Sequence, residues 1–368
     1  RFFSFANEAV SNLLSYANEG AKFVFGPLAD RAALEGSFGP GNGFIFFVLV
    51  MATIILVSAL SSLLYHYGIL QRVVQGMAWL MQRVMRTSGS ESLAAAANIF
   101  MGQTEAPLVI KPFLATMTRS EIMALMTGGM ATIAGGVLAA YVAFGIEAGR
   151  TDMAGHLITA SFLSAPASLL IAKIILPETE QSPTVAGAKV KVERAAQNGI
   201  DALCIGASDG MKLALNVVAM LIAFVAVVAL ANGILVSLQN VAGVDQPVKF
   251  ETIFGWINAP FAWLMGVPMK DCFAVGEVLG SRIVLNEFVG YLQLTAMQKG
   301  NAIGDRAFTL STYALCGFAN FSSIAIQIGG IGALAPSRRA DLAKLGLRAM
   351  IGGILACYLT ATVVGILT

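Results

Sequence analysis

Long apolar stretches that carry almost no charge alternate with shorter polar segments along this chain. A helix needs about 20 apolar residues to cross the roughly 30 Å hydrocarbon core of a bilayer. Several stretches approach or exceed that length, at residues 36–71, 122–146, 157–176, 213–244, 307–337 and 349–368. The pattern therefore predicts an all-α polytopic membrane protein.

Three further segments are amphipathic rather than uniformly apolar. They cover residues 2–26, 69–86 and 249–265. The third carries Trp256 and Trp263 among few charges, as do helices anchored at a membrane interface. Such helices lie in the interface instead of crossing it. We therefore expect three interfacial helices, and an extramembrane loop over the polar stretch 178–194.

Two regions match neither class, because each holds two short apolar arms around a polar turn. Residues 88–116 contain the turn GQTEAP, and residues 271–298 contain the turn LNEF. An arm of about ten residues reaches only half-way across a membrane. The pattern predicts two re-entrant helical hairpins, whose backbone is tolerated at membrane depth only where protein or a water-filled cavity covers it.

A helix interrupted by small and polar residues follows each hairpin. The interruptions are TGGMATIAGG at 127–136 and LCGFANFSS at 315–323. The chain thus carries two copies of one unit, which predicts two broken helices in an inverted repeat. Paired interrupted segments in two halves are the best sequence pointer to a transporter binding site. Close packing of helices through small residues is the alternative for the glycines, but it does not account for the acids in the hairpins.

These acids are Glu105 and Glu287, one in each polar turn. An acid near the bilayer midplane costs at least about 2.5 kcal/mol. Each must therefore be hydrated, bonded to a polar ligand or balanced by a cation. The nearby polar residues carry amides and hydroxyls, and neither turn contains Lys or Arg. This set suits a neutral ligand with many hydroxyls and argues against an anionic substrate.

Composition agrees with a membrane protein. Hydrophobic residues make up 57% of the 368 and charged residues 12%, with a mean hydropathy of +0.76. A soluble domain carries roughly twice that share of charge. The net charge of +2 is too small and scattered for nucleic-acid binding. The cysteines lie far apart in apolar stretches, so we expect packing residues rather than disulfides or metal ligands.

Several motifs together resemble the concentrative nucleoside transporters. They are GQTEAP after the segment ANIF, the triplet NEF at 286–288, CGFANFSSI at 316–324 and NGIDALCIGASDGMKLALNV at 198–217. The resemblance runs from about residue 2 to the end of the chain, and the motifs occur in order. Members of this family usually have one or more helices before the first interfacial helix, which leaves open whether further sequence precedes Arg1.

The resemblance implies a sodium-coupled importer of nucleosides such as uridine, which moves its substrate by an elevator-type mechanism. It implies a homotrimer embedded in lipid in the bacterial inner membrane, with no cofactor besides the coupling ion and no nucleic acid partner. It also implies five segments: 1–86 with interfacial helices and the first scaffold helix, 87–176 with the first transport repeat, 177–265 with a loop, a long scaffold helix and an interfacial helix, 266–335 with the second transport repeat, and 336–368 with the C-terminal helix.

The site residues follow from the same motifs. The resemblance implies that Gln103, Thr104 and Glu105 face the nucleobase, beside Val137 and Phe318. It implies that Glu287, Asn320 and Ser323 bind the ribose hydroxyls. The sodium ligands that it implies are the side chains of Asn98 and Thr132 and the carbonyls of Met101 and Ile133. Oxygen ligands from unwound backbone suit a hard cation on physical grounds as well.

Other functions stay open at this point. An elevator transporter of another polar solute, such as a dicarboxylate, would also use paired hairpins, and a nucleoside transporter could be coupled to protons. An intramembrane enzyme would be supported by a GxSxG, HExxH or paired catalytic Asp motif, and we expect no such catalytic motif in this chain. A passive channel would share the helices but would not accumulate its solute. We therefore expect a transporter with no catalytic residues.

Overall fold

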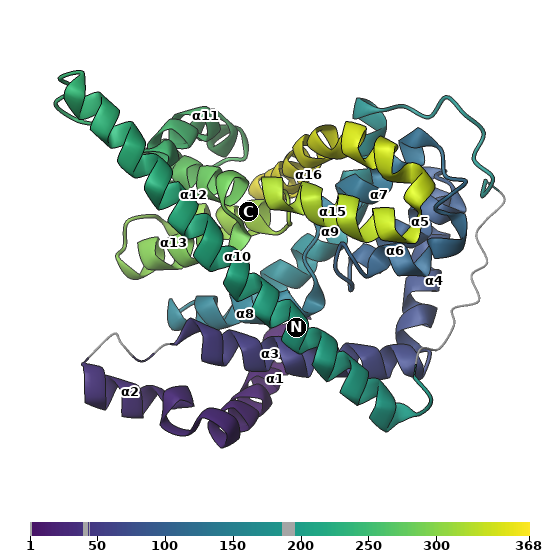
Figure 1. Ribbon diagram of the computed structural model, residues 1–368, viewed down its shortest axis with the longest axis horizontal. Helices are drawn as coiled ribbons and strands as arrows, with labels where there is room; N and C mark the ends of the chain where they lie inside the picture. The colour runs from purple at the N-terminus through teal and green to yellow at the C-terminus, as the bar shows by residue number, and fades with distance from the viewer. Residues whose placement is uncertain (1, 40–42, 44, 186–195) are drawn as a thin grey trace. The chain divides into compact units, whose positions relative to one another are not determined.

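The computed structural model describes residues 2–39, 43, 45–185 and 196–368 (Figure 1). These residues form helices and turns, and no strand occurs among them, which confirms the predicted all-α fold. Of the polar stretch predicted as a loop, residues 178–185 hold no helix, and 186–194 lie outside the described residues. By their contacts the residues group into two compact units, which are described separately below.

The first unit comprises Arg1–Val73, Gly135–Gly155 and Val192–Leu221. Its elements are α1 (Phe2–Phe25), η1 (Gly26–Ala29), α2 (Arg31–Phe38), α3 (Phe46–His66), α8 (Gly135–Glu147) and the first half of α10 (Gly199–Val241). Helix α3 packs against both α1 and α8. Asp30 caps α2, because its carboxylate accepts hydrogen bonds from the backbone N–H groups of Ala32 and Ala33.

Small residues bring α10 close to α3 within this unit. A Cβ atom on Gly206 would lie 2.6 Å from the Ser58 carbonyl oxygen, and one on Gly210 would lie 2.8 Å from Ile55 Cα. These glycines belong to the sequence GASDG, whose letters match the GxSxG motif of serine hydrolases. That motif requires a sharp turn from strand to helix. Here it lies inside the continuous helix α10, where it serves helix packing.

The second unit comprises Val74–Ala134, His156–Lys191 and Ile222–Thr368. It contains most of α4 (Ile69–Met85), the second half of α10, and α5 (Gly89–Asn98), α6 (Ala106–Val109), η2 (Lys111–Phe113), α7 (Arg119–Ala131), α9 (Met153–Ile175), α11 (Phe250–Leu264), η3 (Met269–Asp271), α12 (Cys272–Val284), α13 (Glu287–Lys299), α14 (Asp305–Leu315), α15 (Phe321–Leu334), η4 (Pro336–Arg338) and α16 (Arg339–Leu367). Helices form over all three segments predicted as interfacial, namely α1, α4 and α11.

Each predicted hairpin region contains two helices around a turn, and the second helix of the first region, α6, is only four residues long. In the first, α5 begins at a capping box in which Ser88 and Glu91 exchange hydrogen bonds with each other's backbone N–H groups. In the second, α12 and α13 are separated only by Leu285 and Asn286, and Asn286 caps α13 by accepting from the Val289 N–H at 3.1 Å. Their depth in a membrane stays a prediction.

A buried polar network holds the base of the first hairpin. Glu121, in the first turn of α7, accepts hydrogen bonds from the hydroxyl groups of Ser88, Ser90 and Ser182 at 2.5, 3.0 and 2.5 Å. Glu91 forms an ion pair with Lys173 of α9. Buried charges are tolerated when they are paired and hydrogen-bonded. The network therefore fixes where helices α5 and α7 begin.

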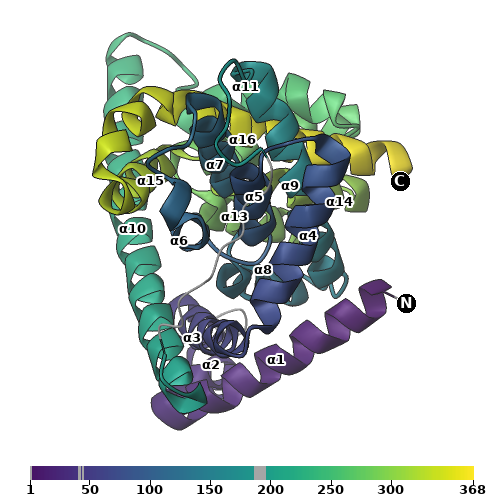
Figure 2. The same ribbon diagram turned by 90° about the vertical axis from the view of Figure 1, so that its right-hand side faces the viewer.

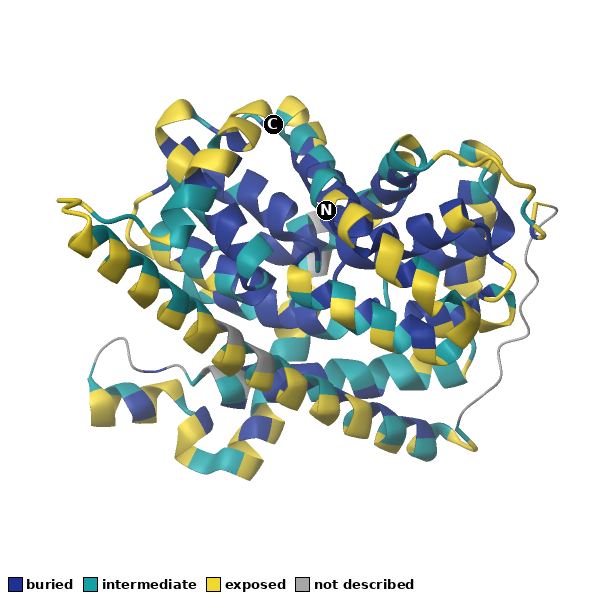
Figure 3. Ribbon diagram, turned by 45° about the horizontal axis from the view of Figure 1, so that its top comes forward, coloured by how far each residue is buried: buried dark blue, intermediate teal, exposed yellow. Residues whose placement is uncertain are grey.

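Both predicted helix interruptions are present. Helix α7 ends at Ala131 and α8 begins at Gly135, while α14 ends at Leu315 and α15 begins at Phe321. Among the described residues four helical spans are long and apolar enough to cross a membrane: Arg119–Glu147, which joins α7 and α8, and Met153–Ile175, Gly199–Val241 and Pro336–Leu367. Helix α10 is the most apolar of these and has very few buried residues (Figure 3).

The two interruptions meet within the second unit. A Cβ atom on Gly317 would lie 2.7 Å from the Met130 carbonyl oxygen, 2.9 Å from the Ala131 carbonyl carbon and 2.6 Å from Cys357 Sγ. Cys357 belongs to α16, which packs against α7 and α14 (Figure 2). Only glycine permits this approach of backbone to backbone. The break after α14 is thus seated on the C-terminal end of α7.

We predict that Gly317→Ala destabilises the protein by about 1–3 kcal/mol, because the methyl group meets backbone atoms that cannot move aside. The measurement is the thermal unfolding midpoint of the purified protein in detergent. The matched control is Gly329→Ala in α15, where an added Cβ meets nothing within 4 Å. Equal unfolding midpoints for the two variants would contradict this account of the contact.

Candidate functional site

The residues predicted to bind substrate lie mostly at the turns and breaks of the second unit. Gln103, Thr104 and Glu105 form the turn between α5 and α6, and Glu287 is the first residue of α13. Phe318 lies half-buried in the break before α15, Asn320 caps α15, and Ser323 is in its first turn. Val137 lies in α8 of the first unit, where it is buried.

A direct hydrogen bond connects the first hairpin to the second broken helix. Gln103 Nε2 donates to Ser323 Oγ at 3.1 Å, and both side chains are buried. They are 220 positions apart in the sequence. The contact brings one residue predicted to face the base against one predicted to face the ribose. The two recognition sets therefore share a boundary instead of lying apart.

A second bond joins the other hairpin to the same helix. Asn320 Nδ2 donates to Glu287 Oε2 at 3.0 Å, and both residues are buried. The Asn320 side-chain oxygen accepts from the Ser323 N–H at 3.0 Å and from the Ser322 hydroxyl at 2.7 Å. Helices α13 and α15 thus begin side by side, and their positive N-terminal ends stabilise the Glu287 carboxylate. Because Glu287 itself supplies the negative charge that these helix ends stabilise, the arrangement suits a neutral ligand.

The two acids differ in their surroundings. Glu287 is 3% exposed, so the cost of burying a charge applies to it as the sequence argument requires. Glu105 and Thr104 are exposed in this structure, and Glu105 Oε2 accepts a long hydrogen bond of 3.4 Å from the Gly102 N–H. An acid in a hairpin can be hydrated, bonded to a polar ligand or balanced by a cation. The exposure of Glu105 fits the first of these, hydration.

Two of the residues predicted to bind sodium, Asn98 and Thr132, lie beside Gly128 of α7. A Cβ atom on Gly128 would lie 3.2 Å from Asn98 Nδ2. Thr132 Oγ1 donates to the Gly128 carbonyl at 2.9 Å. Because this bond uses the only hydroxyl hydrogen, the Thr132 oxygen presents lone pairs alone. Asn98 is 1% exposed, and neither side-chain atom of its amide has a partner among the described residues.

An unpartnered buried amide costs about 1–3 kcal/mol, so this arrangement calls for a ligand at Asn98. Helix α5 ends at Asn98 and α7 ends at Ala131, and the two helices pack together. Their C-terminal ends carry negative partial charge. Met101 and Ile133 follow these ends in the chain, where backbone carbonyls lack a helical partner. The donor set fits a hard monovalent cation.

Gln327 is a site residue that the sequence analysis missed. It is fully buried in α15, and its Nε2 donates to Gln103 Oε1 at 3.0 Å and to the Met126 carbonyl at 3.1 Å. A signal was present in the sequence, because Asn320, Ser323 and Gln327 are the polar residues at spacings of three and four in an apolar helix. Such spacing places all three on one helix face.

Arg282 is a second buried polar residue that the sequence analysis did not consider. It lies in α12, outside the hairpin turn, and is fully buried. Its Nη1 donates to the Ala314 carbonyl at 2.6 Å, near the C-terminal end of α14. A positive charge at this place stabilises the free carbonyls of a helix end. The second repeat thus has a fixed cation where two of its helices end.

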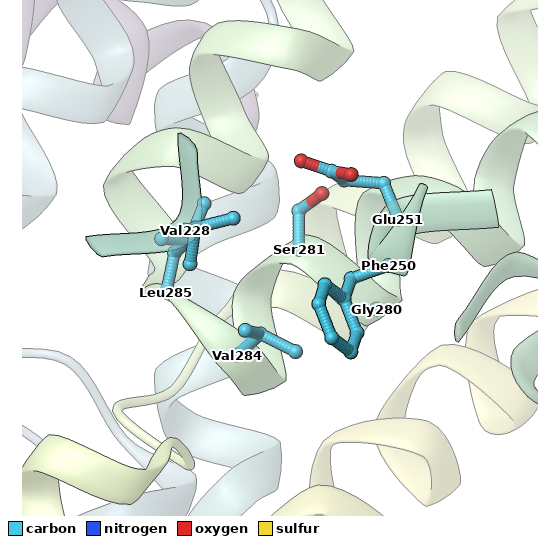
Figure 4. Close-up of a pocket in the computed structure, with 7 residues that line it drawn as sticks. All are labelled: Val228, Phe250, Glu251, Gly280, Ser281, Val284 and Leu285. Carbon is cyan, nitrogen blue, oxygen red and sulfur yellow. The ribbon is translucent and has the colours of Figure 1, made fainter. Parts of the chain in front are cut away.

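A small hollow elsewhere in the second unit is not the substrate site. Val228, Phe250, Glu251, Gly280, Ser281, Val284 and Leu285 line it (Figure 4). It has room for about one water molecule, and Glu251 is already bonded to the Asn232 amide of α10 at 2.9 Å.

The four cysteines form no disulfide bond with one another. The described residues hold no cluster of acids, histidines and cysteines that could bind a metal ion.

Paired hairpins and broken helices with a buried polar connection define a membrane transport protein. Two family models match the chain. One, described as the C-terminus of the Na+ dependent nucleoside transporter, matches residues 156–365, and one described as nucleoside recognition matches 47–147. The chain belongs to the Na+-dependent nucleoside transporter family, whose members are transporters and not enzymes.

Relatives agree over nearly the whole chain. A transporter of Haemophilus influenzae is 45% identical over 98% of this chain and 84% of its own length. The nucleoside permease NupC of Helicobacter pylori is 42% identical, with 97% of this chain and 83% of the relative covered. Sodium/nucleoside cotransporter 1 of Rattus norvegicus is 41% identical over 99% of this chain, which spans 56% of that longer protein.

Solved structures show the same fold. CNTnw in an inward-facing substrate-bound state matches with a TM-score of 0.89 and 38% identity, covering 99% of this chain and 84% of that chain. Variants of CNTnw in an outward-facing state and in an intermediate state match with TM-scores of 0.89 and 0.90. CNTnw, a protein of this fold, therefore has inward-facing, outward-facing and intermediate states.

We predict that Asn320→Asp destabilises the protein, because it replaces the donor to Glu287 with a second buried acid while it keeps the cap oxygen on the Ser323 N–H. Adding Glu287→Gln restores a donor and an acceptor in reversed order. The double variant is expected to be more stable than the sum of the single effects by about 0.5–3 kcal/mol. Thermal unfolding in detergent without nucleoside measures this, and strictly additive effects would contradict a direct bond.

Proposed function

We propose that this protein imports nucleosides across the bacterial inner membrane by sodium symport with an elevator-type movement of its hairpins and broken helices. The observation that carries the proposal is the polar chain across the repeats, in which Gln103 bonds Ser323, and Asn320 bonds both Ser323 and Glu287. It offers amides, hydroxyls and a carboxylate in a buried setting. These groups match the hydroxyls of a ribose and the polar edge of a base.

In this proposal the first hairpin binds the base and the second repeat binds the sugar. Gln103 and Glu105 contact the base, directly and through water, with Thr104 and Phe318 packing around it. Glu287, Asn320 and Ser323 accept from and donate to the ribose hydroxyls. A site built to pair hydroxyls rejects a ligand that lacks them, because its own polar groups are then left dry and unbonded.

Sodium binds between the tip of the first hairpin and the break in the following helix. The side chains of Asn98 and Thr132 and the carbonyls of Met101 and Ile133 are its ligands. The buried, unpartnered Asn98 amide and the acceptor-only Thr132 oxygen support this assignment. Helix α7 borders both sites, because the Met126 carbonyl accepts a hydrogen bond from Gln327 and Gly128 lies beside Asn98. Binding of the ion then organises the turn that carries Gln103.

The proposed assembly is a homotrimer in lipid. Helix α10 supports this, because very few residues of its apolar stretch are buried in a single chain, as expected of a scaffold helix that faces lipid and neighbouring subunits. One sodium ion moved through 100 mV supplies about 2.3 kcal/mol, enough for a roughly fifty-fold gradient of a neutral solute. The membrane potential is thus sufficient to drive accumulation.

We predict that proteoliposomes accumulate radiolabelled uridine against its gradient when sodium is imposed outside, and that uptake carries positive charge inward. Thr132→Ala and Asn98→Ala are expected to raise the half-saturating sodium concentration by about tenfold, the equivalent of one lost interaction. Thr132→Ser keeps the hydroxyl and is the matched control. Equal uptake in sodium and choline at clamped pH would contradict sodium coupling and favour proton coupling or a channel.

We also predict that Glu287→Gln and Glu105→Gln each lower uridine uptake at least tenfold in a folded trimer, since a hydrogen bond to a charged group contributes about 1.5–3 kcal/mol. Glu180→Gln in the exposed loop is the control and should transport normally. Competition by uracil should be far weaker than competition by uridine in the wild-type protein. If uracil competes as well as uridine, the ribose assignment of Glu287 is wrong.

A further inference from the structure

Gln327 occupies a position that determines how the Gln103 amide is turned. Its Nε2 donates to the Met126 carbonyl at 3.1 Å and to Gln103 Oε1 at 3.0 Å. A backbone carbonyl can only accept. The group of Gln327 that faces Met126 must therefore be its NH₂. The orientation of this amide is fixed by chemistry rather than by a choice between its oxygen and nitrogen.

The orientation of the Gln327 amide in turn determines the orientation of the Gln103 amide. Since the second hydrogen of Gln327 Nε2 points at Gln103, the atom of Gln103 that faces it must be its oxygen. The Gln103 NH₂ then faces the other way, where one of its hydrogens is donated to Ser323 Oγ at 3.1 Å. The remaining hydrogen of this NH₂ is the one that Gln103 offers to a ligand. The residue presents a donor, not an acceptor.

Burial makes the reverse arrangement of the Gln327 amide costly. Gln327 is fully buried and Gln103 is 7% exposed. A Cβ atom on Gly129 would lie 2.8 Å from Gln327 Nε2 and 3.0 Å from Gln103 Cβ, so both side chains are seated against the bare backbone of α7. If Gln327 were flipped, its oxygen would face the Met126 carbonyl and its NH₂ would be lost to Gln103. The buried carbonyl would then oppose a second acceptor.

We infer that Gln327 is a specificity-determining positioning residue, which holds Gln103 so that the site favours bases with a carbonyl acceptor over bases with an exocyclic amine at the same ring position. This rests on the proposed function, in which Gln103 faces the base. Uridine and inosine carry the carbonyl, while cytidine and adenosine carry the amine. The two pairs differ in the same way on a small and a large ring, so ring size does not enter the comparison.

The test measures competition of uridine, cytidine, inosine and adenosine against radiolabelled uridine in proteoliposomes. The wild-type protein should prefer the carbonyl member of each pair. In Gln327→Met, which keeps the length but frees the Gln103 amide to rotate, both preferences should fall by about tenfold, the value of one neutral hydrogen bond. Gln327→Glu should shift them further, because its carboxylate draws the Gln103 NH₂ toward itself.

Gln298→Met makes the same substitution at the opposite end of α13 from Glu287, and should leave both preferences unaltered. A Gln327→Met protein that transports uridine with wild-type preferences would overturn the inference. If both Gln327 variants fail to fold, the wild-type protein tests the inference. A preference for cytidine over uridine and for adenosine over inosine would also overturn the inference. Failure of the proposed function is distinct, because then none of the four nucleosides would compete.

Discussion

The site depends on the contact at which Gly317 meets the backbone of Met130 and Ala131. Two helices can end inside an apolar protein only if their free backbone groups find partners. Here the ends are placed against each other, so that the break after α14 lies on the end of α7. The same crossing brings α15 within reach of the first hairpin, and the bond between Gln103 and Ser323 becomes possible. Geometry at one glycine thus joins the two repeats.

The ends of the helices determine which charge each place in the site favours. Where α13 and α15 begin, their N-terminal ends surround Glu287, which bonds Asn320. Where α5 and α7 end, an unpartnered Asn98 and the Thr132 oxygen offer acceptors that suit a cation. In the second repeat Arg282 provides the cation itself, bonded to the Ala314 carbonyl. The repeats therefore share a plan but solve the same electrostatic problem differently.

Much of this was predictable from the sequence, and the reasons are physical. Long charge-free runs predict spanning helices, and the polar turns around Glu105 and Glu287 locate both hairpins, because charge is too costly in lipid to be placed at random. What sequence reasoning missed depends on tertiary contacts. Gln327 looks like one polar residue in an apolar helix until Met126 and Gln103 are seen beside it. The exposure of Glu105 and the packing role of GASDG likewise follow from how helices meet.

We propose that one site, shared by both repeats, couples a nucleoside to sodium. Equilibrium binding of uridine to the purified protein at rising sodium concentrations tests it most directly, beside sodium binding at rising uridine concentrations. Coupled sites must be reciprocal, so each ligand should tighten the other by the same factor. The account predicts uridine affinity that increases with sodium, with an equal effect in the reverse titration. Uridine affinity that is the same in sodium and choline would contradict it.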